Sequence, residues 1–430
     1  MFANIALLAT AATSVLARPH DPNAEKPIPY KYAANNPEAV LPFQAIAPTS
    51  PGVPLSQYRK GKVFDRWVQI WLEDAGELDE ALSVPDYAWL ASQGILLTNY
   101  FGVTHPSQPN YVATSAGDTF GFDADFFEQI ADNTSSVTDI LDDKCVSWAT
   151  YLEDMPFSGF EGFEYKNQTT QINGYPNLKV DDYVRKHNPL IQFNSNTTPL
   201  RLSQQKNFTS FEKDLNNQML PQWNHLTPNM TNNGHDTNDS FSGAWAKSFL
   251  EPLMANEYFY SRTLIHLTFD ATKARNDSNR VYSVLLGGAV PEHLRGTKDD
   301  RFYNHYSALS TVEANWDLHT LGRWDVGANV FKLVADVTGD IYRDFPEVTG
   351  PNPSVFLNTS CPGPFTLTST IDDHNNKPYP IPNTNVRSPK TGRTVLPSIV
   401  DMYSSMQDSP RMYYNDGVRI PDGEHPPPGY

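Results

Sequence analysis

Seven polar residues follow apolar, β-prone runs of the sequence, at the points where four of these runs end. They are Glu73, Asp74, His105, Ser107, Glu153, Asp154 and Asp270. Carboxylates bind hard or borderline divalent cations. A bound cation lowers the pKa of a coordinated hydroxyl and offsets the charge of a phosphate group. The set therefore indicates a site in which the Ser107 hydroxyl is activated beside a divalent metal ion.

Each of these residues also has a simpler structural interpretation. Glu73 and Asp74 could be a solvated loop or helix N-caps. Ser107 could cap the helical segment that follows it, although a helix N-terminus also suits a bound phosphate. Asp270 could cap a loop, and a single histidine such as His105 is more often structural than catalytic. Their joint occurrence after several strands favours a functional site.

The elements that would position these residues alternate along the chain. Apolar runs predict buried strands over 64–72, 95–101, 146–151, 263–269 and 281–286. Helical patterns cover 86–93, 137–142, 307–317 and 326–338. This alternation predicts an α/β fold with a doubly wound, mostly parallel sheet. Ligands of such sheets bind outside the carboxyl ends of the strands, where the seven polar residues lie.

The remaining segments divide the chain into parts of different composition. Residues 1–17 are typical of a signal peptide and residues 18–62 of a Pro-rich lead-in, so a catalytic domain is expected over 63–345. Residues 157–248 are rich in Asn, Gln, Thr and Ser, which favours a surface insertion or cap. Residues 346–430 are predicted to be a Pro- and Asn-rich tail that wraps the domain or is partly disordered. No later stretch is long and apolar enough to predict an integral membrane segment.

Composition indicates a secreted glycoprotein, outside the cell or in the cell wall. The formal net charge of -17 argues against a nucleic-acid partner, which needs Lys and Arg. Eight Asn-x-Ser/Thr sequons predict N-glycans: Asn133, Asn167, Asn196, Asn207, Asn229, Asn238, Asn276 and Asn358. Cys145 and Cys361 could form one disulfide or remain two free thiols, and two cysteines exclude a cysteine-built zinc site.

Several long, ordered motifs resemble those of the fungal phosphate-repressible acid phosphatases. They are the runs 70–73, 99–111, 153–156, 183–189, 227–230, 234–236, 303–307 and 318–325. That family belongs to a broader group of phosphoesterases with phospholipases C and an alkaline-phosphatase-like sheet. The resemblance therefore implies the same α/β fold and hydrolysis of phosphate esters.

The resemblance also implies roles for individual residues. Ser107 would be the nucleophile, and Glu73, Asp74 and Asp270 would bind the divalent metal ion. The residues expected around the phosphate or the leaving group are His235, Asp236 and His305 as catalytic residues, and Asn110, His105 and His319 as substrate-binding residues.

Two departures from the family pattern affect the metal site. Asp74 stands where the family has Asn, and Ala271 stands where it has a second acid after Asp270. The first hypothesis is a phosphomonoesterase that forms a phosphoserine on a phosphorylated small molecule. The second is a phospholipase C-type phosphodiesterase that acts on a phospholipid headgroup. The third, motivated by Ala271, is a secreted glycoprotein of the same fold with weakened catalysis.

Overall fold

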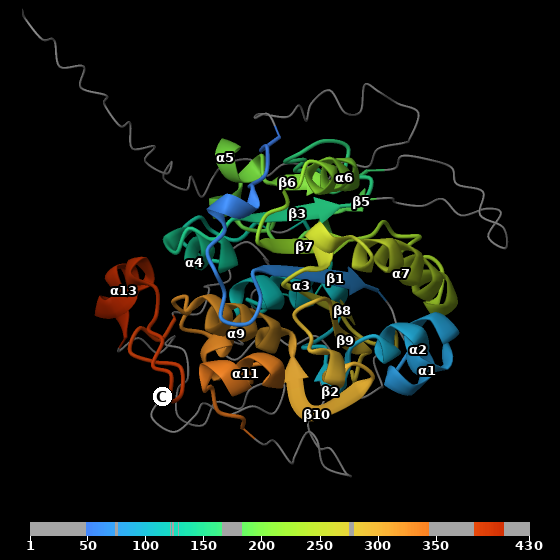
Figure 1. Cartoon of the computed structure of the whole chain (residues 1–430). Coiled ribbons are helices and arrows are strands. Elements are labelled where there is room, and N and C mark those ends of the chain that lie inside the picture. The colour runs from blue at the N-terminus through green and yellow to red at the C-terminus, as the bar shows by residue number, and fades with distance from the viewer. Residues whose placement is uncertain are drawn as a thin grey trace, which may run out of the picture.

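The computed structural model describes residues 49–407, except 74–75, 121, 123, 128, 166–182, 275–278 and 344–381. An eight-stranded sheet forms its centre (Figure 1), in the order β10-β2-β9-β8-β1-β7-β3-β6. The strands are β1 (Arg66–Leu72), β2 (Ile95–Phe101), β3 (Trp148–Leu152), β6 (Gln205–Asn207), β7 (Trp223–Thr227), β8 (Thr263–Phe269), β9 (Ser283–Leu286) and β10 (Thr297–Asn304). A second sheet pairs β4 (Glu164–Tyr165) with β5 (Tyr183–Val184).

All strand pairs of the large sheet are parallel except those that β9 makes with β2 and β8. β9 follows β8 in the chain and pairs with it in the antiparallel sense, an arrangement that needs no crossover helix. The neighbours of β1 in the sheet are β7 and β8, which follow β2, β3 and β6 along the chain. The predicted α/β class with a mostly parallel sheet is therefore confirmed.

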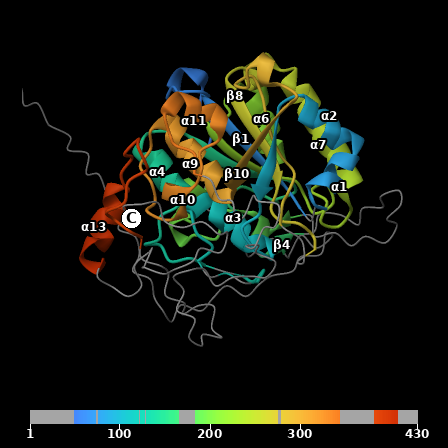
Figure 2. The ribbon, with the colours of Figure 1, turned by 90° about the horizontal axis from the view of Figure 1, so that it is seen from below.

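Helices cover both faces of the sheet (Figure 2). One face carries α3 (Ser107–Ala116), α4 (Val137–Asp143), α9 (His305–Trp316), α10 (Trp324–Gly327) and α11 (Lys332–Thr338). The other carries α1 (Leu78–Ser83), α2 (Pro85–Ser92), α6 (Phe208–Asn216) and α7 (Asp239–Met254). The other α-helices of the described residues are α5 (Pro199–Leu202), α8 (Glu257–Tyr260) and α13 (Pro397–Tyr403).

β1 shows why the central strands appear in the sequence as continuous apolar runs without alternating polar residues. All seven of its residues are buried because helices cover both faces of the sheet. Its polar members are satisfied inside the core: the Gln69 amide lies 2.7 Å from His225 Nδ1, and Arg66 donates to the carbonyl oxygens of Tyr258 and Phe259. The core can therefore include polar residues, provided that each has a partner.

The expectation of a surface insertion over residues 157–248 is wrong. β6 and β7 lie in this range, and β7 pairs with β1 on one side and β3 on the other. α7 also lies in it and packs against α2. The error arose because β7 has the sequence Trp-Asn-His-Leu-Thr, whose polar residues are buried and hydrogen-bonded rather than exposed.

The predicted helix over 326–338 is interrupted. α10 ends at Gly327 and α11 begins only at Lys332. Between them, the Asn329 side chain donates to the carbonyl oxygens of Phe302 and Arg343 and accepts from the N–H of Arg343. These bonds to distant backbone groups hold the segment out of a helix.

Parts of the predicted lead-in and tail pack on the domain. Ser50 and Val53 donate backbone N–H groups to Ser203 and Met219. In the tail, Val395 forms a bridge with Thr320, and Leu396 is buried in the core. Residues 1–48, 344–381 and 408–430 lie outside the described part, and with them the predicted signal peptide, the rest of the lead-in and tail, and Cys361. The pairing of Cys145, which is exposed, stays a prediction.

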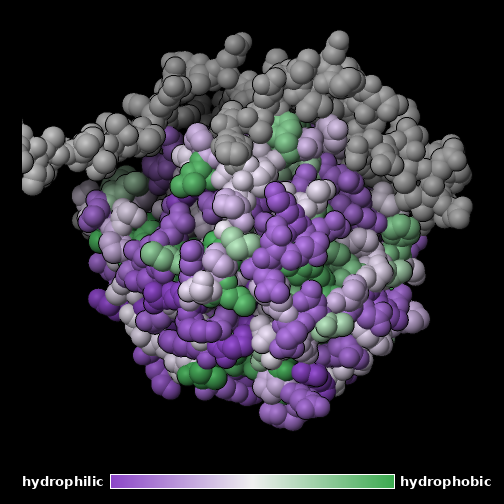
Figure 3. Space-filling model, turned by 45° about the horizontal axis from the view of Figure 1, so that its top comes forward, coloured by the Kyte–Doolittle hydropathy of each residue, from purple (hydrophilic) through white to green (hydrophobic). Residues whose placement is uncertain are grey.

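The face shown in Figure 3 is dominated by hydrophilic side chains, with hydrophobic ones scattered among them. Two of the described sequons, Asn133 and Asn238, are exposed. Asn196 is fully buried, and its amide donates to Ser136 Oγ and to the carbonyl oxygen of Leu190. A glycan on Asn196 is incompatible with this fold. Within the described residues, no helix has both the length and the apolar character needed to cross a membrane.

A buried pair of carboxyl groups predicts how stability depends on pH. Glu313 of α9 is fully buried, and both burial and the neighbouring Asp325 raise its pKa well above the usual value. The Asp325 carboxylate accepts the backbone N–H groups of Leu321 and Arg323. These hydrogen bonds stabilise a negative charge on Asp325 more than on Glu313. A raised pKa in the folded state stabilises the fold below the unfolded pKa, ~4.3, and the contribution is lost as pH rises toward the folded pKa.

We therefore expect the substitution Glu313→Gln to protect the fold as pH rises. The melting temperature of the variant, relative to that of the parent protein, should increase by about 2 °C or more between pH 4 and pH 8. Thermal unfolding at both pH values measures this. Glu251→Gln, an exposed position on α7, serves as the control and should show a constant difference. A constant difference for Glu313→Gln would contradict the prediction.

Candidate active site

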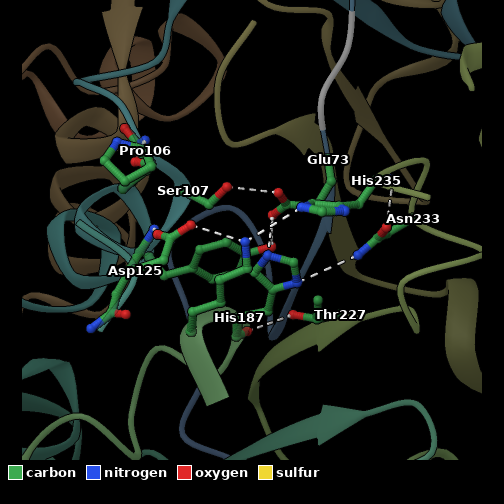
Figure 4. A network of polar contacts seen from close by, with 12 residues as sticks. Glu73, Pro106, Ser107, Asp125, His187, Thr227, Asn233 and His235 are labelled. Atoms are coloured by element: carbon green, nitrogen blue, oxygen red, sulfur yellow. Dashed lines mark hydrogen bonds and ion pairs between the residues drawn. The ribbon is translucent and has the colours of Figure 1, made fainter. Parts of the chain in front are cut away.

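Three of the predicted residues meet at the carboxyl end of the sheet. Leu72 of β1 pairs with Phe269 of β8, so Glu73 and Asp270, which follow them, lie side by side. Ser107 begins α3 and donates its hydroxyl to Glu73 Oε2 at 2.9 Å (Figure 4). A pocket of about 130 Å³ opens here. Its lining includes His105, Pro106, Ser107, Asp125, Lys186, His235, Asp270, Ala271, Thr272 and Lys273.

Glu73 is the buried centre of this network. Its Oε2 accepts the Ser107 hydroxyl, and its Oε1 accepts the Tyr111 hydroxyl at 2.5 Å and lies 3.2 Å from His187 Nε2. Burial alone would raise the pKa of the carboxyl group. The neighbouring His187, Lys186 and His235 outweigh burial and hold the pKa of Glu73 at about 2. Glu73 is therefore a carboxylate that holds the serine hydroxyl in place.

Lys186 and His187 are site residues that were not assigned from the sequence. Both belong to a short 3-10 helix, Arg185–His187, that directly follows β5. Burial lowers the pKa of the His187 imidazole, and the Glu73 carboxylate offsets only part of that effect. The sequence feature that could have identified them is the family motif 183–189, which contains both residues. It was not assigned to the site because it does not follow a predicted strand.

Lys186 remains a cation inside the pocket. Burial opposes its charge, but the carboxylates of Asp125, Glu73 and Asp270 outweigh burial and raise its pKa. Its Nζ lies 2.9 Å from Asp125 Oδ2 and 3.4 Å from His235 Nε2. Lys186 therefore provides a fixed positive charge within a largely acidic site.

His235 and Asp236 form a pair at the pocket. His235 Nδ1 lies 2.8 Å from Asp236 Oδ1, and the backbone N–H of His235 donates to Asn233. The other ring nitrogen, Nε2, is the one near Lys186. The contact with Asp236 thus orients the His235 imidazole so that its Nε2 faces Lys186.

Asn110 shapes the loop that presents Ser107. Its carbonyl oxygen accepts the N–H groups of Val103 and Thr104, and its amide donates to the carbonyl oxygens of Thr104 and Pro106. The side chain is fully buried and does not line the pocket. This geometry makes Asn110 a positioning residue rather than the substrate-binding residue expected from the sequence. His105, from the same loop, does line the pocket.

Two predicted histidines do not face the pocket. His305 is fully buried, with Nε2 2.6 Å from the carbonyl oxygen of Asp270 and Nδ1 3.0 Å from the Tyr100 hydroxyl. Burial lowers its pKa to about 3, so the imidazole is neutral and supports the strand ends from behind. His319 contacts Lys144, Asp143 and Thr394, none of which lines the pocket. These positions do not suit the roles predicted for the two residues.

The residues present suit an oxygen-ligated divalent cation in their chemistry. Glu73 and Asp270 are buried carboxylates on neighbouring strand ends, and a serine hydroxyl contacts one of them. Asp74 lies outside the described residues. Ala271 lines the pocket and offers no ligand. Among the described side chains, no group of three or more His, Cys, Asp or Glu residues is arranged to hold a metal ion.

Comparisons with known proteins identify the family of this chain. A model of the phosphoesterase family matches residues 60–319. The chain is 49% identical over 322 residues to an acid phosphatase from Aspergillus fumigatus, which is 75% of this chain and 69% of that protein. It is 46% identical to a phosphate-repressible acid phosphatase from Penicillium chrysogenum, over 84% of this chain and 83% of that protein.

Among solved structures, the fold is similar to that of a protein in the alkaline phosphatase superfamily from Vibrio parahaemolyticus. The sequence identity is 11% and the TM-score is 0.38, over 61% of this chain and 68% of that chain. The family resemblance read from the motifs is confirmed by the family model and the fungal relatives. The match includes Glu73, Ser107 and Asp270, and the chain belongs to the phosphoesterase family.

Proposed function

We propose that this protein is a phosphomonoester hydrolase, an acid phosphatase, that uses Ser107 as its nucleophile. The observation that carries the proposal is the Ser107 hydroxyl held 2.9 Å from the buried Glu73 carboxylate, in a pocket whose lining includes two lysines and two histidines. The fungal relatives are named acid phosphatases, which supports a monoester substrate.

In the proposed first step, Ser107 Oγ forms a bond to phosphorus and the bond from phosphorus to the leaving oxygen breaks. The hydroxyl proton passes toward the Glu73 carboxylate. Once the phosphate engages Lys186 and releases its contact with His235, Nε2 of His235 can carry a proton and give it to the leaving alkoxide, while Nδ1 stays on Asp236. An imidazole carries both protons under mildly acidic conditions, and such conditions would suit this role. In the second step, water gives a proton to His235 Nε2 and its oxygen bonds to phosphorus, while the bond from phosphorus to Ser107 Oγ breaks. Ser107 Oγ takes back the proton from Glu73, and phosphate is released.

A divalent metal ion is part of the proposal. Glu73 and Asp270, with Asp74, are the residues that would hold it. When bound, such an ion offsets phosphate charge and lowers the pKa of a nearby hydroxyl. The protein's own contribution is to fix Ser107 against Glu73 and to place the Lys186 cation on the pocket wall.

The pocket size bears on the substrate. A volume of about 130 Å³ accommodates a phosphate group. This fits a phosphorylated small molecule. The phospholipase C-type alternative needs the same core chemistry, and no described feature favours it over the monoesterase. The alternative of weakened catalysis rests on Ala271, which offers no metal ligand. The contact between Ser107 and Glu73 argues for an active enzyme.

Secretion and N-glycosylation belong to the same proposal. Residues 1–17 have the pattern of a signal peptide, and the exposed sequons Asn133 and Asn238 are accessible for glycans. Recovery of the enzyme from culture medium with glycans at these two positions would support both parts.

Trapping the covalent intermediate tests the proposal directly. We expect rapid acid quenching during turnover of an aryl phosphate to leave phosphate on Ser107, because an acidic quench preserves a phosphoserine. Peptide mass spectrometry measures the site. Parallel assays with an aryl phosphate and with phosphatidylcholine separate a monoesterase from a phospholipase C. Turnover without any modified Ser107 would contradict the serine mechanism, and faster turnover of the lipid diester would favour the alternative.

A further inference from the structure

Asp125 occupies a position between two groups suited to binding phosphate. Its Oδ1 accepts the backbone N–H of Gln108 at 3.0 Å, and its Oδ2 lies 2.9 Å from Lys186 Nζ. Gln108 is the residue directly after the proposed nucleophile. The Asp125 carboxylate therefore bridges the pocket cation and the amide next to Ser107.

The same two donors are the ones that a bound phosphate would need. Phosphorus must approach Ser107 Oγ to within about 3–3.5 Å before attack. At that distance the phosphoryl oxygens would lie near the N–H of Gln108, in the first turn of the ten-residue helix α3. Lys186, which lines the pocket, would supply a charge-assisted hydrogen bond. Both donors are engaged by Asp125 in this structure.

We propose that Lys186 and the backbone N–H of Gln108 bind the phosphoryl oxygens, and that the Asp125 carboxylate is an internal competitor that the substrate displaces. This inference rests on the proposed function, since it places the phosphate beside Ser107. Asp125 thus mimics the anion that the site receives, with one carboxylate oxygen on each donor.

Charge and exposure around Asp125 support a displaceable group. The Asp125 side chain is 26% exposed, whereas that of Glu73 is completely buried. The carboxylates of Glu73, Asp125 and Asp270 all favour the charged form of Lys186. A phosphate that entered with Asp125 still in place would add charge to an already acidic site. Withdrawal of Asp125 removes that repulsion and releases both donors at once.

A rival interpretation is that Asp125 merely positions Lys186. The two interpretations predict opposite signs. If Asp125 competes with phosphate, removing its charge strengthens phosphate binding. If it positions the lysine, removing its charge weakens phosphate binding, as loss of the lysine itself would.

The experiment measures binding of inorganic phosphate to the full-length protein by calorimetry, together with its inhibition constant against an aryl phosphate. Asp125→Asn keeps the shape of the side chain and removes its charge, and we expect the dissociation constant to fall about fivefold or more. Lys186→Met should raise it about tenfold or more. Asp125→Ser, which shortens the side chain, should also bind phosphate more tightly.

Asp86→Asn is the matched control. Asp86 is 29% exposed and pairs with Lys247 at 3.2 Å, so the same charge is removed from a similar ion pair outside the pocket. Its phosphate affinity should stay unchanged. Weaker or unaltered phosphate binding in both Asp125 variants would overturn the inference. Calorimetry detects binding without turnover, so a failed serine mechanism and a failed Asp125 inference are distinguishable.

Discussion

Replacing Ser107 by alanine is expected to lower kcat for an aryl phosphate by about 10³-fold or more. The substitution removes the only atom that attacks phosphorus in the proposed mechanism. It leaves Lys186, His235 and the acidic residues in place, so inorganic phosphate should still bind. Steady-state kinetics and phosphate calorimetry on the same preparation measure the two quantities separately.

Ser115→Ala is the appropriate control for this prediction. Ser115 is a buried serine on the same helix, and its hydroxyl bonds to the carbonyl oxygens of Tyr111 and Val112 rather than to the site. Its loss should leave kcat within about threefold of the parent value, with a modest effect on stability. If Ser107→Ala retained a tenth or more of the parent activity, another group would have to be the nucleophile.

The sequence was sufficient to predict the strand ends of the site. Three site residues follow apolar runs that lack a polar face: Glu73, Ser107 and Asp270. Parallel strands bring their carboxyl ends to one edge of the sheet, so residues that follow such strands are expected to lie together. That rule needs only the positions of the strands. It therefore also led to Glu153, which follows β3 but lines a different pocket and accepts the amide of Asn232. A position at a strand end does not tell which of several side chains converge.

The residues that were missed come from segments without regular periodicity. Lys186 and His187 lie in a three-residue 3-10 helix, and Asp125 lies in an irregular segment between α3 and α4. Their approach to Ser107 depends on tertiary contacts that no local pattern encodes. His319 was assigned to the site for the opposite reason: it belongs to a family motif, but buried members of that motif, such as Leu321, stabilise the core. A family motif contains residues of the site and residues of the core, and the motif alone does not tell which is which.

The second large effect is expected for Glu73→Gln, which should lower kcat by about 100-fold or more. The amide keeps the size of the side chain but removes the negative charge and presents an N–H₂ group to donors. Glu73 accepts hydrogen bonds from the Ser107 and Tyr111 hydroxyls and contacts His187, so at least one of these donors loses its acceptor. If a divalent ion is bound, its content in the purified protein should also fall.

Tyr111→Phe separates the charge of Glu73 from its hydrogen bonds. It removes one donor to the Glu73 carboxylate and preserves the carboxylate itself, as well as the stacking of the ring on His187 at 5.1 Å. We expect a loss of kcat of about tenfold or less, with the metal content unchanged. Kinetics, elemental analysis and thermal unfolding of both variants test whether Glu73→Gln lowers kcat more than Tyr111→Phe does. Glu73→Gln with kcat within threefold of the parent value, and folded by its melting curve, would show that the buried carboxylate serves the fold alone, because every catalytic role proposed for it requires its charge.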